Sequence, residues 1–271
     1  MNEAKAEAAA VAPGQLHWHK KGHVGHIIFD NQKKFNAVNF DMWLAIPKAI
    51  AEFNADPDIR VVVLEGAGEK AFVSGADISQ FGDKRSGDGA AEYNKATEAG
   101  YMSILACTKP VVAKIRGICM GGGLGIIMNC DVRICADNAK FRMPAGRLGL
   151  GYAFGGLKRF SEVIGPANTA DLFFSARIFG GADALSMGLV KQVVPVAEFD
   201  QVVDDYITMI SENAPLTLAA AKGALMEMRK PQAEQDPSRI QKMVETCFAS
   251  ADYNEGRKAF AEKRTPDFKG R

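Results

Sequence analysis

The sequence lacks any uninterrupted apolar segment approaching the roughly 20 residues that a membrane-spanning helix needs. Residues 1–14 are rich in Ala, Glu and Lys and lack the apolar core of a signal peptide. Basic residues (33) and acidic residues (32) nearly balance, so a formal net charge of +1 gives no attraction for nucleic acid or a membrane surface. We therefore expect a cytoplasmic protein with neither kind of partner.

Cysteine and histidine are sparse. The five cysteines are odd in number and show no CxxC spacing, which argues against both a disulfide framework and a zinc site. All four histidines lie near the N-terminus, where His17 and His19 would share one face of a strand. That spacing fits a metal site, but solvent-facing positions of a hairpin explain it more simply, so no metal is expected.

Apolar strands alternate with amphipathic helices up to about residue 195, which predicts a layered α/β core with right-handed crossovers. Continuous apolar runs are typical of strands buried on both faces. The expected elements include a hairpin (16–19 and 24–29), a helix capped by Asn39 and kinked at Pro47, strands at 61–64, 111–113 and 132–136, and helices over 92–107 and after the glycines at 121–123.

From Val196 onward the pattern is almost wholly helical, with an amphipathic stripe that begins at Phe199 and ends at Ile210. We accordingly divide the chain into a flexible tail (1–14), a core (15–195) and a C-terminal helical region (196–271).

Two glycine-containing stretches indicate a ligand site. Residues 71–78 (AFVSGADI) follow a buried strand, and a helix is expected to begin near Asp77. Residues 117–125 (GICMGGGLG) place three glycines at the start of another helix. Amides at a helix start lack partners within the helix, and glycine lets a ligand approach the backbone closely.

Together these stretches resemble the crotonase (enoyl-CoA hydratase/isomerase) superfamily, in which two loops each give one amide to an oxyanion hole. The resemblance runs from about Gly22 to the C-terminus and assigns the two donors to Ala76 and Gly122. It implies an acyl-CoA thioester as substrate and no permanently bound cofactor. It also implies a spiral of β-β-α turns, and a C-terminal helical region that supports a homotrimer or hexamer.

The resemblance also implies where CoA binds. Residues 29–37 look like the family's first CoA-contacting loop, although Gln32 stands where a proline is usual, and 255–264 look like the C-terminal helix whose lysine reaches CoA phosphates, often those of a neighbouring subunit. Without the resemblance, Lys263 would read as a solvated surface lysine. The implied CoA contacts are Lys33, Phe35, Ala37, Ala76, Asp77, Ile78, Gly122, Phe260 and Lys263.

The sequence departs from the family's hydratases at the two catalytic glutamates. Hydration uses one to activate water and the other to handle the α-proton. The first position, two residues after the glycine triplet, is Gly125, and the second, after a proline, is Ala145. Neither residue transfers protons, so a paired-carboxylate mechanism is not expected.

Three neighbouring residues are candidate substitutes. Arg147 fits a surface or pocket-rim position, and Asp131 directly precedes a strand, where a structural hydrogen bond is the simpler role. Tyr152 lies in a loop where superfamily decarboxylases and ring-opening hydrolases carry a tyrosine. Its phenol is able to orient a carboxylate or a water, or to protonate a carbanion; its alternative role is packing in the acyl pocket.

Two classes of function follow. The first is an enzyme that stabilises a thioester enolate or oxyanion: the whole-chain resemblance suggests hydration, whereas Gly125, Ala145 and Tyr152 suggest decarboxylation or hydrolysis. The second is a non-catalytic acyl-CoA binding protein. The acyl group stays open, because pocket shape depends on loops such as 81–91.

Overall fold

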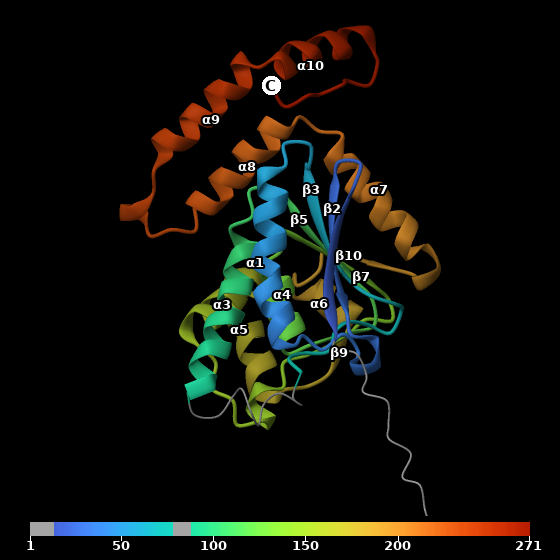
Figure 1. Ribbon diagram of the computed structural model, residues 1–271, viewed down its shortest axis with the longest axis vertical. Helices are drawn as coiled ribbons and strands as arrows, with labels where there is room; N and C mark the ends of the chain where they lie inside the picture. The colour runs from blue at the N-terminus through green and yellow to red at the C-terminus, as the bar shows by residue number, and fades with distance from the viewer. Residues whose placement is uncertain (1–13, 78–87) are drawn as a thin grey trace, which may run out of the picture.

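The computed structural model describes residues 14–77 and 88–271 (Figure 1). Its strands are β1 (Gln15–Lys21), β2 (Val24–Asp30), β3 (Val61–Gly66), β4 (Ala71–Val73), β5 (Val111–Ile115), β6 (Ile118–Met120), β7 (Val132–Ala136), β8 (Lys140–Arg142), β9 (Phe179–Gly180) and β10 (Gln192–Val194). Its α-helices are α1 (Phe40–Ala55), α3 (Asp88–Leu105), α4 (Gly122–Met128), α5 (Phe154–Ser175), α6 (Gly181–Ser186), α7 (Phe199–Ser211), α8 (Pro215–Glu227), α9 (Pro237–Ala249) and α10 (Ala251–Glu262).

Successive β-β-α turns build two sheets. The turns β3-β4-α3, β5-β6-α4 and β7-β8-α5 each give their first strand to a larger sheet, ordered β1-β2-β3-β5-β7-β10. Their second strands join a smaller sheet, ordered β4-β6-β8-β9. The larger sheet is parallel apart from the β1–β2 hairpin. This arrangement confirms the predicted spiral.

The inner strands β3 and β5 of the larger sheet are buried on both faces, which explains their continuous apolar runs. In β3, Val62 and Leu64 pack into the main core beneath α1 and α3, while Val61 and Val63 face the opposite way. On that second side they meet Phe199 and other apolar residues of α7. A strand covered by helices on both faces has no polar side, so the alternation usual in half-buried strands is absent.

Helix α1 begins as its sequence predicts. The side chain of Asn39 accepts a hydrogen bond from the backbone N–H of Met42 at 2.8 Å, the geometry of an N-cap. The helix continues through Pro47 as a single element and buries Trp43, Ile46 and Phe53 among its core residues. It lies beside α3, and this pair covers one face of the larger sheet (Figure 1).

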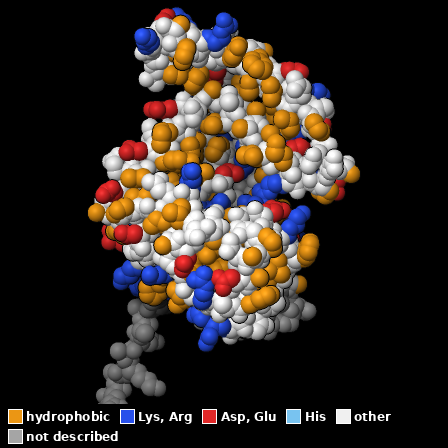
Figure 2. Space-filling view, turned by 180° about the vertical axis from the view of Figure 1, so that it is seen from behind, with side chains coloured by type: hydrophobic (Ala, Val, Ile, Leu, Met, Phe, Trp, Pro, Cys, Tyr) orange, Lys and Arg blue, Asp and Glu red, His pale blue; other side chains and the backbone are white. Residues whose placement is uncertain are grey.

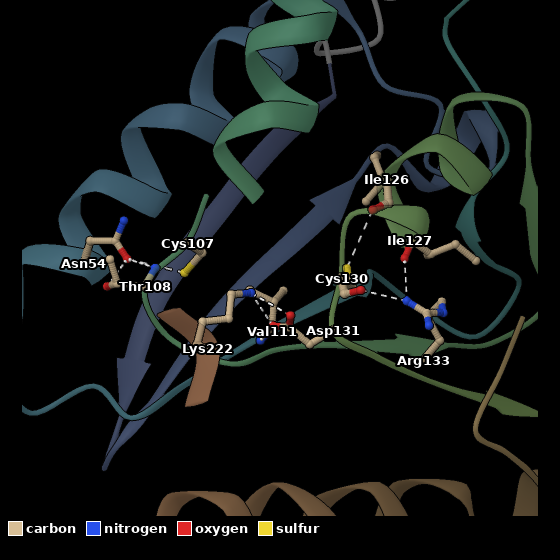
Figure 3. A network of polar contacts seen from close by, with 10 residues as sticks. All are labelled: Asn54, Cys107, Thr108, Val111, Ile126, Ile127, Cys130, Asp131, Arg133 and Lys222. Atoms are coloured by element: carbon tan, nitrogen blue, oxygen red, sulfur yellow. Dashed lines mark hydrogen bonds and ion pairs between the residues drawn. The ribbon is translucent and has the colours of Figure 1, made fainter. Parts of the chain in front are cut away.

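The C-terminal helices form an arm at one end of the molecule (Figure 1). An ion pair ties this arm to the core: Lys222 of α8, which is 5% exposed, places Nζ 2.6 and 2.5 Å from the two carboxylate oxygens of Asp131 (Figure 3). At the start of β3, the Arg60 guanidinium donates to the backbone carbonyls of Ser211 and Phe268. The arm is therefore held by charged side chains of the core.

Apolar side chains are exposed on the same arm (Figure 2). Leu225, Met228, Phe248 and Phe260 are between 59% and 88% exposed. Within residues 14–77 and 88–271, no helix is long and apolar enough to cross a membrane. In that described part, no cluster of three or more His, Cys, Asp or Glu side chains is arranged to hold a metal ion, and His17 and His19 are exposed on the hairpin.

Candidate active site

The loop after β4 turns the amide of Ala76 away from Val38. Val38 donates its N–H to the carbonyl of Gly75 at 2.8 Å and accepts from the N–H of Asp77 at 2.9 Å. Because successive groups of an extended chain point to opposite sides, the N–H of Ala76 between them points away from Val38. Gly75 makes this turn with φ of 130°, a conformation that side chains rarely permit.

Helix α4 begins at Gly122, so the N–H of this residue has no partner inside the helix. The next residue, Gly123, lies against the preceding turn of the spiral: an added Cβ would be 2.3 Å from the carbonyl oxygen of Val73. Only glycine permits this approach, and it brings the start of α4 directly beside the loop after β4.

The two amides therefore lie across a narrow gap. A Cβ placed on Gly122 would be 3.4 Å from the nitrogen of Ala76, and one placed on Gly75 would be 3.9 Å from the nitrogen of Gly122. In the described residues, neither N–H has a protein acceptor, and both Ala76 and Gly122 are half-buried. Two adjacent preorganised donors are what an oxyanion hole requires.

The loop expected to contact CoA is bonded to this site. Lys34 forms an ion pair with the buried carboxylate of Asp77 at 2.8 Å. The backbone N–H of Ser74 donates to the carbonyl of Phe35 at 3.0 Å. These bonds place the 32–36 loop along the edge of the oxyanion loop.

The residues expected to contact CoA fall into two groups. In the first, Lys33 and Phe35 are exposed, whereas Ala37 and Asp77 are buried. Ile78 lies outside the described residues, as does the helix expected from about Asp77. In the second group, Phe260 lies in the last turn of α10 and Lys263 is its C-cap, and both are exposed. Helix α10 lies well away from α4 within the same chain (Figure 1).

A tyrosine that sequence reasoning missed fills the first glutamate position. Around Gly125, a Cβ would lie 2.4 Å from the hydroxyl oxygen of Tyr101 and 2.6 Å from its Cζ. The same hydroxyl donates to the carbonyl of Gly122 at 3.3 Å. Tyr101 comes from α3, so its place beside α4 depends on packing between two turns of the spiral, which no local motif in the sequence reveals.

Replacing Gly125 with alanine is expected to destabilise the protein by about 1–3 kcal/mol, the usual effect of overpacking a core. A loss of stability is informative, because a glycine-to-alanine change inside a helix ordinarily adds up to about 1 kcal/mol of stability. Chemical denaturation measures the free energy of unfolding. In a Tyr101→Ala background, where the ring is gone, the same change should become neutral or stabilising; an equal loss in both backgrounds would contradict the contact.

The other positions singled out from the sequence have structural surroundings. Ala145 is buried and begins a short 3-10 helix (Ala145–Arg147). Arg147 is exposed, in agreement with a surface position. Asp131 accepts from the backbone N–H of Val111 at 2.7 Å and pairs with Lys222, which confirms its structural hydrogen-bonding role.

Tyr152 packs in an aromatic cluster. Its ring meets Phe173 and Phe160 edge-on, at centroid distances of 4.9 and 6.0 Å, and lies against Gly156 in the first turn of α5. Burial raises the pKa of Tyr152 to about 12, so its phenol remains protonated at neutral pH. The ring therefore packs among these aromatic side chains, while both a place in the acyl pocket and a catalytic role for Tyr152 stay predictions.

Comparison with known proteins agrees with this geometry. Residues 19–271 match the family model described as enoyl-CoA hydratase/isomerase. A crotonyl-CoA hydratase of Syntrophomonas wolfei is 34% identical over 89% of this chain and 93% of its own length. The peroxisomal Delta(3,5)-Delta(2,4)-dienoyl-CoA isomerase of Arabidopsis thaliana is 32% identical over 90% of this chain and 92% of its own.

Solved structures show the same likeness. The crystal structure of an enoyl-CoA hydratase/carnithine racemase from Magnetospirillum magneticum superimposes with a TM-score of 0.88 at 30% identity, covering 94% of this chain and 96% of that one. The similarity extends over nearly the whole of both chains, and residues 19–271 match the family model. This protein therefore belongs to the enoyl-CoA hydratase/isomerase family.

Proposed function

We propose that this protein decarboxylates a malonyl-type CoA thioester through an enolate held by the amides of Ala76 and Gly122. The observation that carries the proposal is the combination of two adjacent N–H donors, neither of which has an acceptor among the described residues, with the absence of a carboxylate at positions 125 and 145. Loss of CO2 itself generates the enolate, so this reaction needs an oxyanion hole and a proton donor but no carboxylate base.

Hydration, the reaction named for several relatives, makes different demands. Water must be activated and a proton moved at the neighbouring carbon, for which the hydratases use two carboxylates. Here Gly125 has no room for a longer side chain because Tyr101 fills the space. A glutamate at position 125 would therefore require the ring of Tyr101 to move.

A screen of thioesters tests the proposal. Crotonyl-CoA, malonyl-CoA and acetyl-CoA are each incubated with the protein, and products are identified by mass. We expect acetyl-CoA and CO2 from malonyl-CoA and negligible hydration of crotonyl-CoA. Release of free CoA would favour hydrolysis instead, and rapid hydration of crotonyl-CoA would contradict the proposal. Binding of every ester without turnover would favour the non-catalytic acyl-CoA binding protein.

We also infer that the helical region 196–271 packs against other copies of the chain, as a homotrimer or hexamer. The exposed apolar residues of α8, α9 and α10 support this inference, since a large apolar surface on one arm indicates a contact. Helix α10, which ends next to Lys263 and carries Phe260, is distant from α4 in its own chain. In such an assembly, these two residues would approach CoA bound to a neighbouring copy. Light scattering on the purified protein separates a monomer from these assemblies.

A further inference from the structure

We propose that Tyr101 faces the acyl group and donates the proton that the substrate's α-carbon takes up after decarboxylation. The inference rests on the proposed function for its reaction and on separate contacts for its geometry.

The position of Tyr101 is tied to the oxyanion donor. Its hydroxyl hydrogen-bonds the carbonyl of Gly122, the residue whose N–H forms half of the hole. It lies 2.4 Å from where the Cβ of residue 125 would be, and is therefore in the space that the family's first glutamate would enter. By contrast, the contacts of Tyr152 are with Phe160, Phe173 and Gly156.

The ring is held in place by Trp43. The two rings meet edge-on, with centroids 5.1 Å apart, and Trp43 is fully buried. Trp43 is fixed in turn because its Nε1 donates to the hydroxyl of Tyr93 at 3.1 Å. It also reaches the oxyanion hole, since Cζ2 would be 3.5 Å from a Cβ on Gly122. Tyr101 itself is half-buried, so part of the side chain borders open space.

A phenol at this position suits a substrate that carries a carboxylate. The bond between the α-carbon and the carboxylate breaks, CO2 leaves, and the electron pair forms the enolate, whose oxygen accepts from the amides of Ala76 and Gly122. The α-carbon then takes the proton of the Tyr101 hydroxyl, and water returns a proton to the phenolate. A glutamate here would be anionic at neutral pH and repel the leaving carboxylate, whereas a phenol is neutral.

Two measurements test the geometry and the chemistry separately. The geometry is tested with acetyl-CoA carrying a ¹³C-labelled acetyl group, by recording nuclear Overhauser contacts between its methyl protons and tyrosine ring protons. A contact that disappears in Tyr101→Leu, which removes the ring, is assigned to Tyr101; no such contact in the unaltered protein overturns the proposal, whether or not malonyl-CoA is turned over.

The chemistry is tested with malonyl-CoA. Tyr101→Phe keeps the ring and removes the hydroxyl, so we expect kcat to fall by about 10²-fold or more, the usual contribution of a general acid, with KM unchanged. Tyr206→Phe on α7, behind the larger sheet, is the matched control and should keep full kcat. If the kcat of Tyr101→Phe is within about threefold of that of the unaltered protein, the loss is much smaller than the contribution of a general acid, and the proposed proton transfer is wrong. If the unaltered protein fails to decarboxylate malonyl-CoA, the proposed function fails, and this proton transfer with it, while the ring contact is still decided by the nuclear Overhauser experiment.

Discussion

Replacing Gly122 with proline is expected to lower kcat by about 10²–10³-fold, the usual effect of removing one oxyanion-hole donor. Proline is well tolerated at the first position of a helix, where the N–H has no helical partner, and Gly122 occupies that position in α4. The substitution therefore removes the donor while preserving the helix. Steady-state kinetics on the thioester that the screen identifies as substrate provides the measurement.

Gly122→Ala is the control because it keeps the N–H. Its methyl group would meet the nitrogen of Ala76 at 3.4 Å and Cζ2 of Trp43 at 3.5 Å, both tolerable contacts. We expect the alanine variant to keep a clearly higher kcat than the proline variant, and the proline variant to remain folded by circular dichroism. Equal kcat values in the two variants would show that the Gly122 amide is not a donor.

Lys222→Met is expected to cost about 2–3 kcal/mol of unfolding free energy, because it leaves the carboxylate of Asp131 without its cation. The full range for a buried pair is about 3–5 kcal/mol. The lower figure applies here because 29% of the Asp131 side chain is exposed and retains some hydration. Chemical denaturation measures the loss, and proteolysis should show α8–α10 cleaved more readily, since this pair joins the arm to the core (Figure 3).

Two variants sharpen this test. Lys158→Met removes a cation that is 54% exposed and 4.0 Å from Glu162, and should leave stability unchanged within error. Adding Asp131→Asn to Lys222→Met removes the unpaired charge while keeping an acceptor for the N–H of Val111, and should recover part of the loss. A double variant as unstable as the sum of the single changes would contradict coupling between the two charges.

The two amides of the proposed oxyanion hole were singled out from the sequence through the family resemblance, and the phenol beside them was not. Ala76 and Gly122 lie in stretches that local residues mark, a glycine turn after a short strand and a glycine triplet at a helix start, and the resemblance assigned the donor role to them. Asn39 was found in the same way, from its position one residue before an amphipathic stretch. Tyr101 lies in the middle of α3, where nothing in the neighbouring residues marks it. Only the packing of α3 against α4 brings it to Gly125.

The close approach of Gly123 to Val73 has a consequence for evolution and engineering of the site. The amide of Ala76 belongs to the turn that contains β4 and that of Gly122 to the turn that contains α4, so the width of the gap between them depends on how closely these two turns pack. Core substitutions that change the spacing between these two turns will therefore change the distance between the two amides, even though the substituted residues do not contact the substrate. If the proposed oxyanion hole operates here, packing and activity depend on the same contact between Gly123 and Val73.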